Sequence, residues 1–337
     1  MKKISIIGSG VAGIEAAIIL SKLKYQVSLF ERDTITNINL RNKTYLFPDF
    51  SEAKYLVEKL DEKLKSSSVE LMLGKEICHI EKQGKQWKIY DQNKRAYEAD
   101  ALLLATGYEP FDAKRKEELG YGIYKGVITS MDLEEMFKEE KIVNSIGETP
   151  KKVLFLQCVG SRDEKSGNNY CSKVCCITAV KQAIEIRKFL PETEVYIFYM
   201  DLRMWGQNYE ELYREAQEKY NIYFVRGRIS EAAATFDSKI QIKAEDTLLG
   251  LPLKMTTDLF VLMVGMEPSS GTRKLSQICD ISGEYGFMKS LNQHLDDNLT
   301  TQEGLFVAGS CKRPVNITDA VADARAVATK IHEYLAE

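Results

Sequence analysis

The chain has 337 residues, of which 44% are hydrophobic and 28% are charged, and its formal net charge is −3. This length and composition are those of a globular protein with room for two domains. The slightly acidic balance argues against a general nucleic-acid-binding protein, and no apolar run approaches the ~20 residues of a membrane helix. We therefore expect a cytoplasmic protein whose thiols stay reduced.

The N-terminal segment 3–20, KISIIGSGVAGIEAAIIL, has a β-branched run, then Gly8, Gly10 and Gly13, then a run rich in alanine and isoleucine. This pattern predicts a strand, a tight turn and a helix, the arrangement that binds dinucleotides. Gly8 permits the turn, Gly10 lets a pyrophosphate approach the backbone, and Gly13 lets helix and strand pack closely. The N–H groups at the start of the helix would face the phosphates.

A second strand is predicted within 26–32, QVSLFER, and it ends beside Glu31, about 20 residues after the glycines. At that place a carboxylate can accept hydrogen bonds from ribose hydroxyls. The alternative is a glycine-rich turn with an unrelated surface glutamate. The strand, helix and Glu31 together favour a nucleotide site.

Two later segments extend this domain. Residues 99–111, ADALLLATGYEPF, predict a buried strand that ends in Ala-Thr-Gly at 105–107. Residues 299–335 predict a strand running into Gly309, a loop, and a helix from about Thr318. With the N-terminal motif, these segments make the chain resemble the two-domain flavoproteins of the glutathione and thioredoxin reductase type.

That resemblance implies an α/β fold of two dinucleotide-binding, Rossmann-like domains. The FAD-binding domain would be discontinuous, formed by 1–145 and 290–337, and the second domain, 146–289, would be inserted into it. The helix that begins near Asp319 would point its N-terminus at the isoalloxazine ring.

The resemblance also implies FAD at the N-terminal site, with Gly309 near the pyrophosphate. Members of this family usually carry Gly-Asp at this strand end, whereas this chain has Gly309 and Ser310. The residues assigned to FAD in this way are Gly8, Gly10, Val11, Ala12, Gly13, Glu31, Arg32, Ile77, Ala105, Thr106, Gly107, Gly309, Ser310, Thr318, Asp319 and Ala320.

The inserted domain lacks the second glycine motif that such reductases use for NAD(P)H. Residues 152–157, KVLFLQ, predict its first strand, and 177–190 and 194–201 predict the next helix and strand, but cysteines replace the glycine turn between them. The chain also contains no Cys-x-x-Cys pair, so a dithiol reductase would lack its active cysteines.

Four of the seven cysteines cluster here, at Cys158, Cys171, Cys175 and Cys176. Four thiolates suit a [4Fe–4S] cluster or a structural zinc ion. Adjacent Cys175 and Cys176 fit one tetrahedral ion poorly, whereas they can bind different irons of a cluster. The start of a helix also favours anionic sulfur. Buried structural thiols are the remaining alternative.

The segments QCVGSRD, YCSKVCC, FYMDLRMWGQNYEELYREAQ, VRGR and VGMEP together resemble the A-type subunit of heterodisulfide reductase. The resemblance implies that the four cysteines hold a [4Fe–4S] cluster. Without the ferredoxin-type insertions of larger members, the chain is similar to the short form found in the heterodisulfide-reductase-like complex of bacterial sulfur oxidation. It implies partner subunits of the B and C type, NAD as a candidate carrier, and a homodimer.

Other chemical groups are weaker candidates. Cys78 and Cys279 are expected to be structural. Cys311, two residues after Gly309, is a weaker candidate for a redox role. Arg203 suits a salt bridge as well as a cofactor contact, and Tyr209 suits a helix core. Two other functions stay open: a free-standing NAD(P)H-dependent FAD oxidoreductase, and a zinc-stapled, flavin-binding assembly scaffold.

Overall fold

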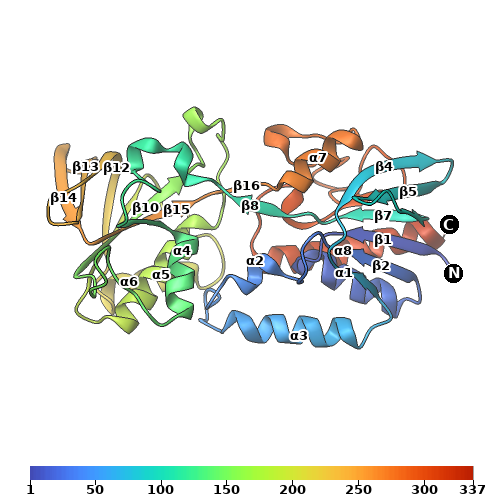
Figure 1. The fold of residues 1–337 in the computed structure, drawn as a ribbon, viewed down its shortest axis with the longest axis horizontal. Coiled ribbons are helices and arrows are strands. Elements are labelled where there is room, and N and C mark those ends of the chain that lie inside the picture. Colours follow the sequence, from blue (N-terminus) through green and yellow to red (C-terminus); the bar gives the residue numbers. More distant parts are fainter. Residues whose placement is uncertain (337) are drawn as a thin grey trace. The chain divides into compact units, whose positions relative to one another are not determined.

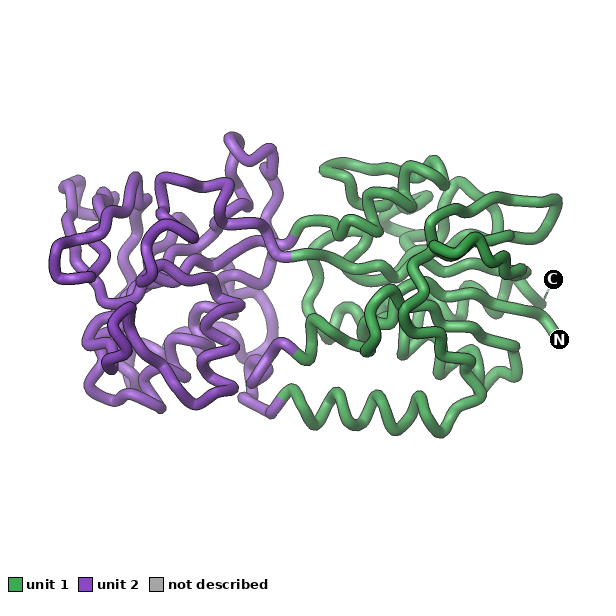
Figure 2. The backbone as a smooth tube through the Cα atoms, viewed as in Figure 1, with its two compact units in different colours: residues 1–41, 53–109, 267–337 green, residues 42–52, 110–266 purple. Residues whose placement is uncertain are grey.

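The computed structural model of the protein describes residues 1–336. The chain forms two compact units, shown in green and purple in Figure 2. Unit 1 consists of 1–41, 53–109 and 267–337, and unit 2 consists of 42–52 and 110–266. Each unit has its own parallel sheet and its own buried core, so the prediction of two α/β domains is confirmed.

Unit 1 is built on a parallel sheet with the strand order β17-β7-β1-β2-β3. Ile4, Ile6 and Ile7 of the central strand are buried, as expected for a strand covered on both faces. The strands are β1 (Lys3–Ile7), β2 (Gln26–Phe30), β3 (Glu70–Met72), β7 (Ala101–Leu104) and β17 (Leu305–Val307).

Helices cover one face of this sheet and a three-stranded antiparallel sheet lies on the other, as Figure 1 shows. The helix that follows the glycine turn packs against the C-terminal helix; the first contacts β1 and β2, and the second contacts β17. The helices are α1 (Val11–Lys22), α2 (Ile38–Arg41), α3 (Ala53–Lys65), α7 (Ser270–Ile278) and α8 (Ile317–Ala336). The antiparallel strands are β4 (Ile77–Gln83), β5 (Gln86–Asp91) and β6 (Ala96–Ala99).

Unit 2 has a seven-stranded sheet with the order β14-β13-β12-β11-β10-β15-β9. Strands β9 to β12 and β15 pair in parallel, and β12, β13 and β14 form an antiparallel edge. The strands are β9 (Val127–Thr129), β10 (Lys152–Val159), β11 (Glu194–Tyr199), β12 (Tyr223–Ala234), β13 (Ile240–Asp246), β14 (Leu251–Thr257) and β15 (Leu259–Val264). A separate two-stranded pairing joins β8 (Tyr108–Pro110) and β16 (Met266–Pro268).

The helices of unit 2 are α4 (Ser130–Lys138), α5 (Cys175–Phe189) and α6 (Tyr209–Glu218). A capping box starts α4: Thr129 Oγ1 accepts the Asp132 N–H at 3.2 Å, and Asp132 Oδ2 accepts the Thr129 N–H at 2.7 Å. Val153 and Phe155 of β10 share a hydrophobic core with α4, α5 and α6. This core places the start of α5 beside the end of β10.

The compact units divide the chain at different places from the expected boundaries at 145 and 290. Residues 127–129 form β9, which pairs with β15, so this stretch belongs to the sheet of unit 2. Helix α7 packs against β4 of unit 1. Residues 42–52 also belong to unit 2, although the segments before and after them in sequence, 1–41 and 53–109, belong to unit 1.

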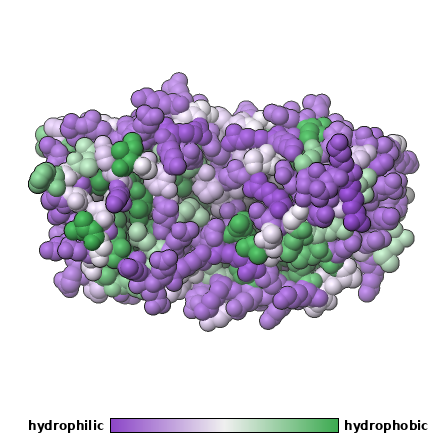
Figure 3. All heavy atoms as spheres, viewed as in Figure 1, coloured by the Kyte–Doolittle hydropathy of each residue, from purple (hydrophilic) through white to green (hydrophobic). Residues whose placement is uncertain are grey.

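The surface is largely polar. Figure 3 shows a face covered mainly by hydrophilic residues, with hydrophobic ones in small groups. No helix within residues 1–336 is both long enough and apolar enough to span a membrane.

Candidate functional site

The glycine turn joins β1 to α1 through contacts that leave no room for side chains. A Cβ on Gly8, whose φ is +105°, would lie 2.4 Å from the Ala105 carbonyl oxygen. A Cβ on Gly13 would lie 1.9 Å from the Gly8 carbonyl oxygen. Gly10 differs, because a Cβ there would meet no atom within 4 Å. The backbone at Gly10 is therefore open to a ligand, while Gly8 and Gly13 hold the turn together.

The carboxyl ends of three neighbouring strands meet at this turn. Ala105, which follows β7, donates its N–H to the Ile7 carbonyl at 2.8 Å. Gly309, which follows β17, has a φ of +77°, and a Cβ on it would lie 2.9 Å from the Ala12 Cβ. Gly10 precedes α1 as its N-cap and has no side chain, so the first N–H groups of the helix have no side-chain cap. This arrangement suits a dinucleotide phosphate.

Three of the four cysteines that are close in sequence lie where β10 ends and α5 begins, and Cys171 lies in the segment between these elements. Cys158 lies near the end of β10 with a φ of +62°, unusual for a residue other than glycine. Cys175 and Cys176 form the buried first turn of α5. Burial raises the pKa of Cys158, and Cys176 and Cys171 add to this effect. Cys158 and Cys171 are partly buried, whereas Cys175 and Cys176 are buried.

The family model of the pyridine nucleotide-disulphide oxidoreductases matches residues 2–324, nearly the whole chain. The chain belongs to this family. The FAD-binding fold of the family accounts for the glycine turn of unit 1, and it confirms the resemblance to the glutathione and thioredoxin reductase type.

The A-type subunits of heterodisulfide reductases provide similar sequences. The chain is 38% identical over 273 residues to that of the H(2):CoB-CoM heterodisulfide,ferredoxin reductase of Methanothermobacter thermautotrophicus, covering 79% of this chain and 41% of the relative. It is 39% identical over 258 residues to the A-type iron-sulfur subunit of the CoB--CoM heterodisulfide reductase of Methanocaldococcus jannaschii, covering 74% and 39%. The matched region thus spans about two fifths of these relatives' length.

Solved structures share the fold. Thioredoxin reductase from Lactococcus lactis superposes with a TM-score of 0.72 at 20% identity, covering 100% of this chain and 99% of that one. Thioredoxin reductase from T. acidophilum gives 0.69 at 18% identity, with 100% of both chains covered. At these identities the likeness concerns the fold alone.

In this pyridine nucleotide-disulphide oxidoreductase, Glu31 is fixed against the glycine turn. Its Oε2 accepts the Ser9 N–H at 2.9 Å and the Ser9 hydroxyl at 2.7 Å, and its Oε1 accepts the Asp33 N–H at 3.0 Å. Arg32 instead pairs with Glu109 at 3.0 Å and donates to the Ser270 hydroxyl at 2.8 Å. The structure therefore holds Glu31 beside the turn and engages Arg32 elsewhere on unit 1.

Asn37 is a buried polar residue near the turn that sequence reasoning missed. Its backbone N–H donates to the Ser9 carbonyl at 3.0 Å, and its φ is +55°. Its side chain is 2% exposed, and neither the amide nitrogen nor the amide oxygen has a hydrogen-bond partner. Asparagine tolerates a positive φ better than most residues. The asparagine six positions after Glu31 was therefore the feature of the sequence that could have pointed to this residue.

The acidic residue expected next to Gly309 comes from α8. Asp323 Oδ2 accepts the Gly309 N–H at 2.6 Å, and Asp323 Oδ1 accepts from Lys312 Nζ at 2.8 Å. Lys312 also donates to Asp297 Oδ2 at 2.7 Å. Burial by itself would raise the pKa of Asp297, but Arg313 and Lys312 hold it at about 2. A compact ionic network therefore fixes this strand end, and Ser310 carries no part of it.

The other residues assigned to FAD lie at the same end of the sheet or in its core. The Thr106 and Thr272 hydroxyls are 2.6 Å apart, which ties the end of β7 to α7. Ile77 is buried at the start of β4. Thr318, Asp319 and Ala320 lie in the first turn of α8, where Asn316 Oδ1 accepts the Asp319 N–H at 2.7 Å.

Burial dominates the chemistry of the cysteine cluster. It raises the pKa of Cys158 to about 12 and raises that of Cys175 well above its ordinary value. Burial also raises the pKa of Cys176, while the Arg203 N–H, 3.5 Å from Cys176 Sγ, opposes this effect. The Lys173 N–H lies 3.3 Å from Cys171 Sγ. Burial thus disfavours the thiolate forms of Cys158, Cys175 and Cys176, and a bound metal would supply compensating positive charge.

Within residues 1–336, no three His, Cys, Asp or Glu side chains are placed to share a single metal ion. A zinc site needs its four ligands around one centre. A [4Fe–4S] cluster makes a different demand, because each thiolate binds its own iron. Within the described residues the four cysteines form no preassembled ligand group for either centre.

The turn after β10 differs from a nucleotide turn. Residues 160–174 form a long excursion there, with a 3₁₀ turn at Glu164–Ser166. A Cβ on Gly160 would lie 2.1 Å from the Phe111 ring, so an aromatic side chain fills the space beside this glycine. The second glycine motif is thus replaced in structure as well as in sequence.

The remaining cysteines do not join the cluster. Cys311 is fully buried, its Sγ lies 3.1 Å from the Ala308 carbonyl oxygen, and burial raises its pKa to about 12. A fully buried thiol with a raised pKa suits a structural role better than a redox role. Cys279 is buried too. Tyr209 packs edge-on against Phe47 with ring centroids 5.6 Å apart, as a core residue would.

Unit 2 also contains a buried charge cluster. Lys181 Nζ lies 2.7 Å from Glu134 Oε1 and 3.4 Å from Glu185 Oε1, and the three side chains are at most 2% exposed. The Thr44 N–H donates to Glu134 at 2.9 Å, and Lys181 donates to the Tyr45 carbonyl at 2.9 Å. These bonds explain why residues 42–52 belong to unit 2.

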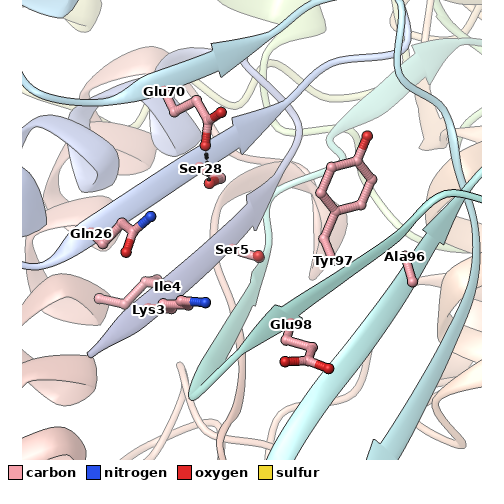
Figure 4. Close-up of a pocket in the computed structure, with 9 residues that line it drawn as sticks. All are labelled: Lys3, Ile4, Ser5, Gln26, Ser28, Glu70, Ala96, Tyr97 and Glu98. Carbon is pink, nitrogen blue, oxygen red and sulfur yellow. Dashed lines mark hydrogen bonds between the residues drawn. The ribbon is translucent and has the colours of Figure 1, made fainter. Parts of the chain in front are cut away.

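A cavity of about 310 Å³ lies over the sheet of unit 1 (Figure 4). Its lining includes Lys3 and Gln26, the first residues of β1 and β2. Ser28 Oγ donates to Glu70 at 2.9 Å within it. Dinucleotides bind at the opposite, carboxyl ends of parallel strands, so this cavity is not the nucleotide site.

Proposed function

We propose that the chain is an electron-transfer subunit that carries FAD in unit 1 and a [4Fe–4S] cluster in unit 2. The observation that supports this most strongly is the replacement of the second nucleotide turn by a segment that carries four cysteines. The FAD-binding fold is common to the family, whereas this replacement removes the usual place for NAD(P)H. A metal centre at that position gives unit 2 a role in electron transfer.

FAD would lie along the glycine turn. Gly10 leaves the backbone open to the pyrophosphate, and the uncapped start of α1 supplies N–H donors for its oxygen atoms. Glu31 is held beside the turn, where it can accept from a ribose hydroxyl. The unpaired amide of buried Asn37 adds a donor and an acceptor next to Ser9. These groups bind and orient the flavin.

The cluster would be held by Cys158, Cys171, Cys175 and Cys176. Backbone N–H groups of Lys173 and Arg203 already contact two of these sulfur atoms, and such contacts stabilise sulfur ligands that carry negative charge. A bound flavin exchanges electrons in pairs, and a bound cluster transfers them one at a time. The chain itself supplies binding, orientation and exclusion of water around the buried thiols.

The partners follow from the relatives. Their names identify the A-type subunits of heterodisulfide reductases, so we propose that the chain works with cluster-bearing subunits of the B and C type. It would relay electrons between thiol, disulfide or sulfane-sulfur chemistry on those subunits and a soluble carrier such as NAD. We further propose that it forms a homodimer and acts in the cytoplasm.

Anaerobic purification with analysis of iron, sulfide, zinc and flavin on one sample tests the proposal. About four irons and one FAD per chain are expected. FAD with zinc in place of iron would favour an assembly scaffold and would overturn the electron-transfer role. Rapid reduction of the flavin by NADH without partner subunits would instead favour a free-standing oxidoreductase.

A further inference from the structure

Residues 42–52, the strap, are fastened to unit 2 by a polar clamp. The Thr44 N–H donates to Glu134 Oε2 at 2.9 Å, and Lys181 Nζ donates to the Tyr45 carbonyl at 2.9 Å. Glu134 lies on α4 and Lys181 lies on α5, and both side chains are at most 2% exposed. The backbone of the strap is therefore bound by two buried side chains of opposite charge.

The donors of this clamp serve Glu134 and the strap. Lys181 Nζ gives one N–H to Glu134 Oε1 at 2.7 Å and another to the Tyr45 carbonyl. The Gln182 amide donates to Glu134 Oε1 at 2.9 Å and to the Ser130 carbonyl at 2.8 Å. With the N–H from the strap, Glu134 accepts three hydrogen bonds. These bonds suit an ionised carboxylate, which only accepts.

Glu185, one turn beyond Lys181 on α5, receives none of these donors. Its two carboxyl oxygens are buried without a hydrogen-bond partner, and so is Gln182 Oε1. Lys181 Nζ lies 3.4 Å from Glu185 Oε1 without donating to it. A bare carboxylate is costly in such a place, whereas a carboxylic acid can donate its O–H to an acceptor three residues away on the helix, such as Gln182 Oε1. The contacts thus indicate a neutral Glu185 beside an ionised Glu134.

The charged side chains around Glu185 belong to α4, α5 and the strap. They are Glu134, Lys138, Lys181, Lys188 and Lys43. Burial is the largest influence on Glu185 and raises its pKa to about 8, against Lys181 and Lys188. Lys181 and Lys43 hold the pKa of Glu134 below its usual value despite burial. The two carboxyl groups therefore differ in charge for the same reason that they differ in hydrogen bonds.

We infer that a proton on Glu185 keeps the strap closed on unit 2, and that loss of this proton to solvent opens it. An ionised Glu185 needs several donors, and Lys181 has one N–H left to give. The other donors must come from water that enters beside the strap, or from Lys181 as it leaves the Tyr45 carbonyl. Either change breaks the clamp.

Apolar contacts keep this opening local. Phe47 and Phe50 of the strap pack against the hydrophobic core of unit 2. The Phe47 ring lies edge-on to Tyr209 at 5.6 Å, and Lys188 Nζ lies 3.7 Å from the centre of the Phe50 ring. These contacts do not depend on the proton of Glu185. We therefore expect the backbone around Thr44 to open while the sheet of unit 2 stays folded.

Hydrogen exchange measured by mass spectrometry tests the inference on strap peptides near pH 6.5 and near pH 9.5, after correction for the intrinsic effect of pH on exchange. Protection of the wild-type strap should fall at least ~10-fold at the higher pH. E185Q should keep the strap protected at both pH values. E215Q, at a side chain of α6 that is 40% exposed, is the matched control and should follow the wild type. Peptides of β10 should stay protected throughout.

Three results would overturn the inference. They are equal protection of the wild-type strap at both pH values, the same fall in E185Q as in the wild type, and a parallel fall in β10, which would mean that unit 2 unfolds as a whole. If E185Q does not fold, infrared spectra of the wild type decide. The C=O band of protonated carboxyl groups should weaken between the two pH values, and an unchanged band would refute a titrating Glu185.

Discussion

Asp323 accepts the Gly309 N–H at 2.6 Å through one carboxylate oxygen, and the two residues stand 14 positions apart. The other oxygen accepts from Lys312 Nζ and Asn298 Nδ2, both at 2.8 Å. The first residue of the 3₁₀ turn after β17 is thereby bound to α8. An acidic group thus serves this strand end although the residue after Gly309 is a serine.

Breaking this link should destabilise unit 1. In Asp323→Asn, Lys312 loses a charged partner while its side chain stays 2% exposed. We expect the free energy of unfolding in urea to fall by about 2 kcal/mol, below the 3–5 kcal/mol of a fully buried pair, because Asp323 is 18% exposed. Glu333→Gln, which removes an exposed partner of Lys330, should change it by less than ~1 kcal/mol. An equal effect of both changes would contradict this role.

The glycine turn allows folding and flavin binding to be separated. Gly10→Ala adds a Cβ that meets no protein atom at a φ of −72°, so the protein should fold normally. The methyl group would stand where the pyrophosphate approaches, and FAD affinity should fall at least ~10-fold, or ~1.4 kcal/mol. Fluorescence titration of the apoprotein with FAD measures this.

Gly271→Ala, in α7, is the control for that experiment. Its Cβ would lie 3.8 Å from the nearest atom, Ser269 Oγ, and alanine favours helices over glycine. FAD affinity should stay unchanged. Unchanged FAD affinity in Gly10→Ala would place the flavin elsewhere.

If the four cysteines hold the iron, a change in one of them should remove iron and leave FAD bound. Cys171→Ser should lower the affinity for iron by more than ~100-fold, because changes outside the ligands already lower metal affinity ~10–100-fold. The iron content should therefore fall, while FAD in unit 1 stays bound. Cys78→Ser replaces a partly exposed thiol of unit 1 outside the cluster and should keep its iron. Iron and flavin analysis of anaerobically purified proteins checks both. Equal iron in both variants would exclude Cys171 as a ligand.

The buried charge cluster of unit 2 predicts a pH dependence of stability. Burial raises the pKa of Glu185 to about 8 from an ordinary 4.5, with Lys181 opposing this and Glu134 adding to it. Between these values the folded protein keeps a proton that the unfolded chain has released. Stability should therefore fall as pH rises from 4.5 to 8 and stay low above 8.

Glu185→Gln removes that titration. At pH 9 the variant should be more stable than the wild type by about 2 kcal/mol or more, whereas near pH 5 the two should agree closely. Thermal unfolding at a series of pH values measures the difference. In Glu194→Gln, at a side chain that is 52% exposed, the stability difference from the wild type should not change with pH in this way. A constant offset at every pH would mean that Glu185 does not titrate in this range.

The sequence alone predicted the parts of the protein that depend on neighbours along the chain. A strand, three spaced glycines and a helix specify a nucleotide turn, because each glycine answers a local steric demand: Gly8 and Gly13 could not carry a Cβ. The sequence after 152–157 likewise shows directly that a second glycine motif is missing there. The two-domain α/β fold was implied by the resemblance of these segments to the glutathione and thioredoxin reductase type.

The tertiary structure decided what depends on residues distant in sequence. Asp323 reaches Gly309 only because α8 packs against the end of β17, and no spacing rule connects the two. Residues 42–52 join unit 2 because Glu134 and Lys181 bind their backbone, although the neighbouring sequence belongs to unit 1. Burial, which encloses Cys311 completely, is likewise set by packing of the whole domain rather than by any local pattern.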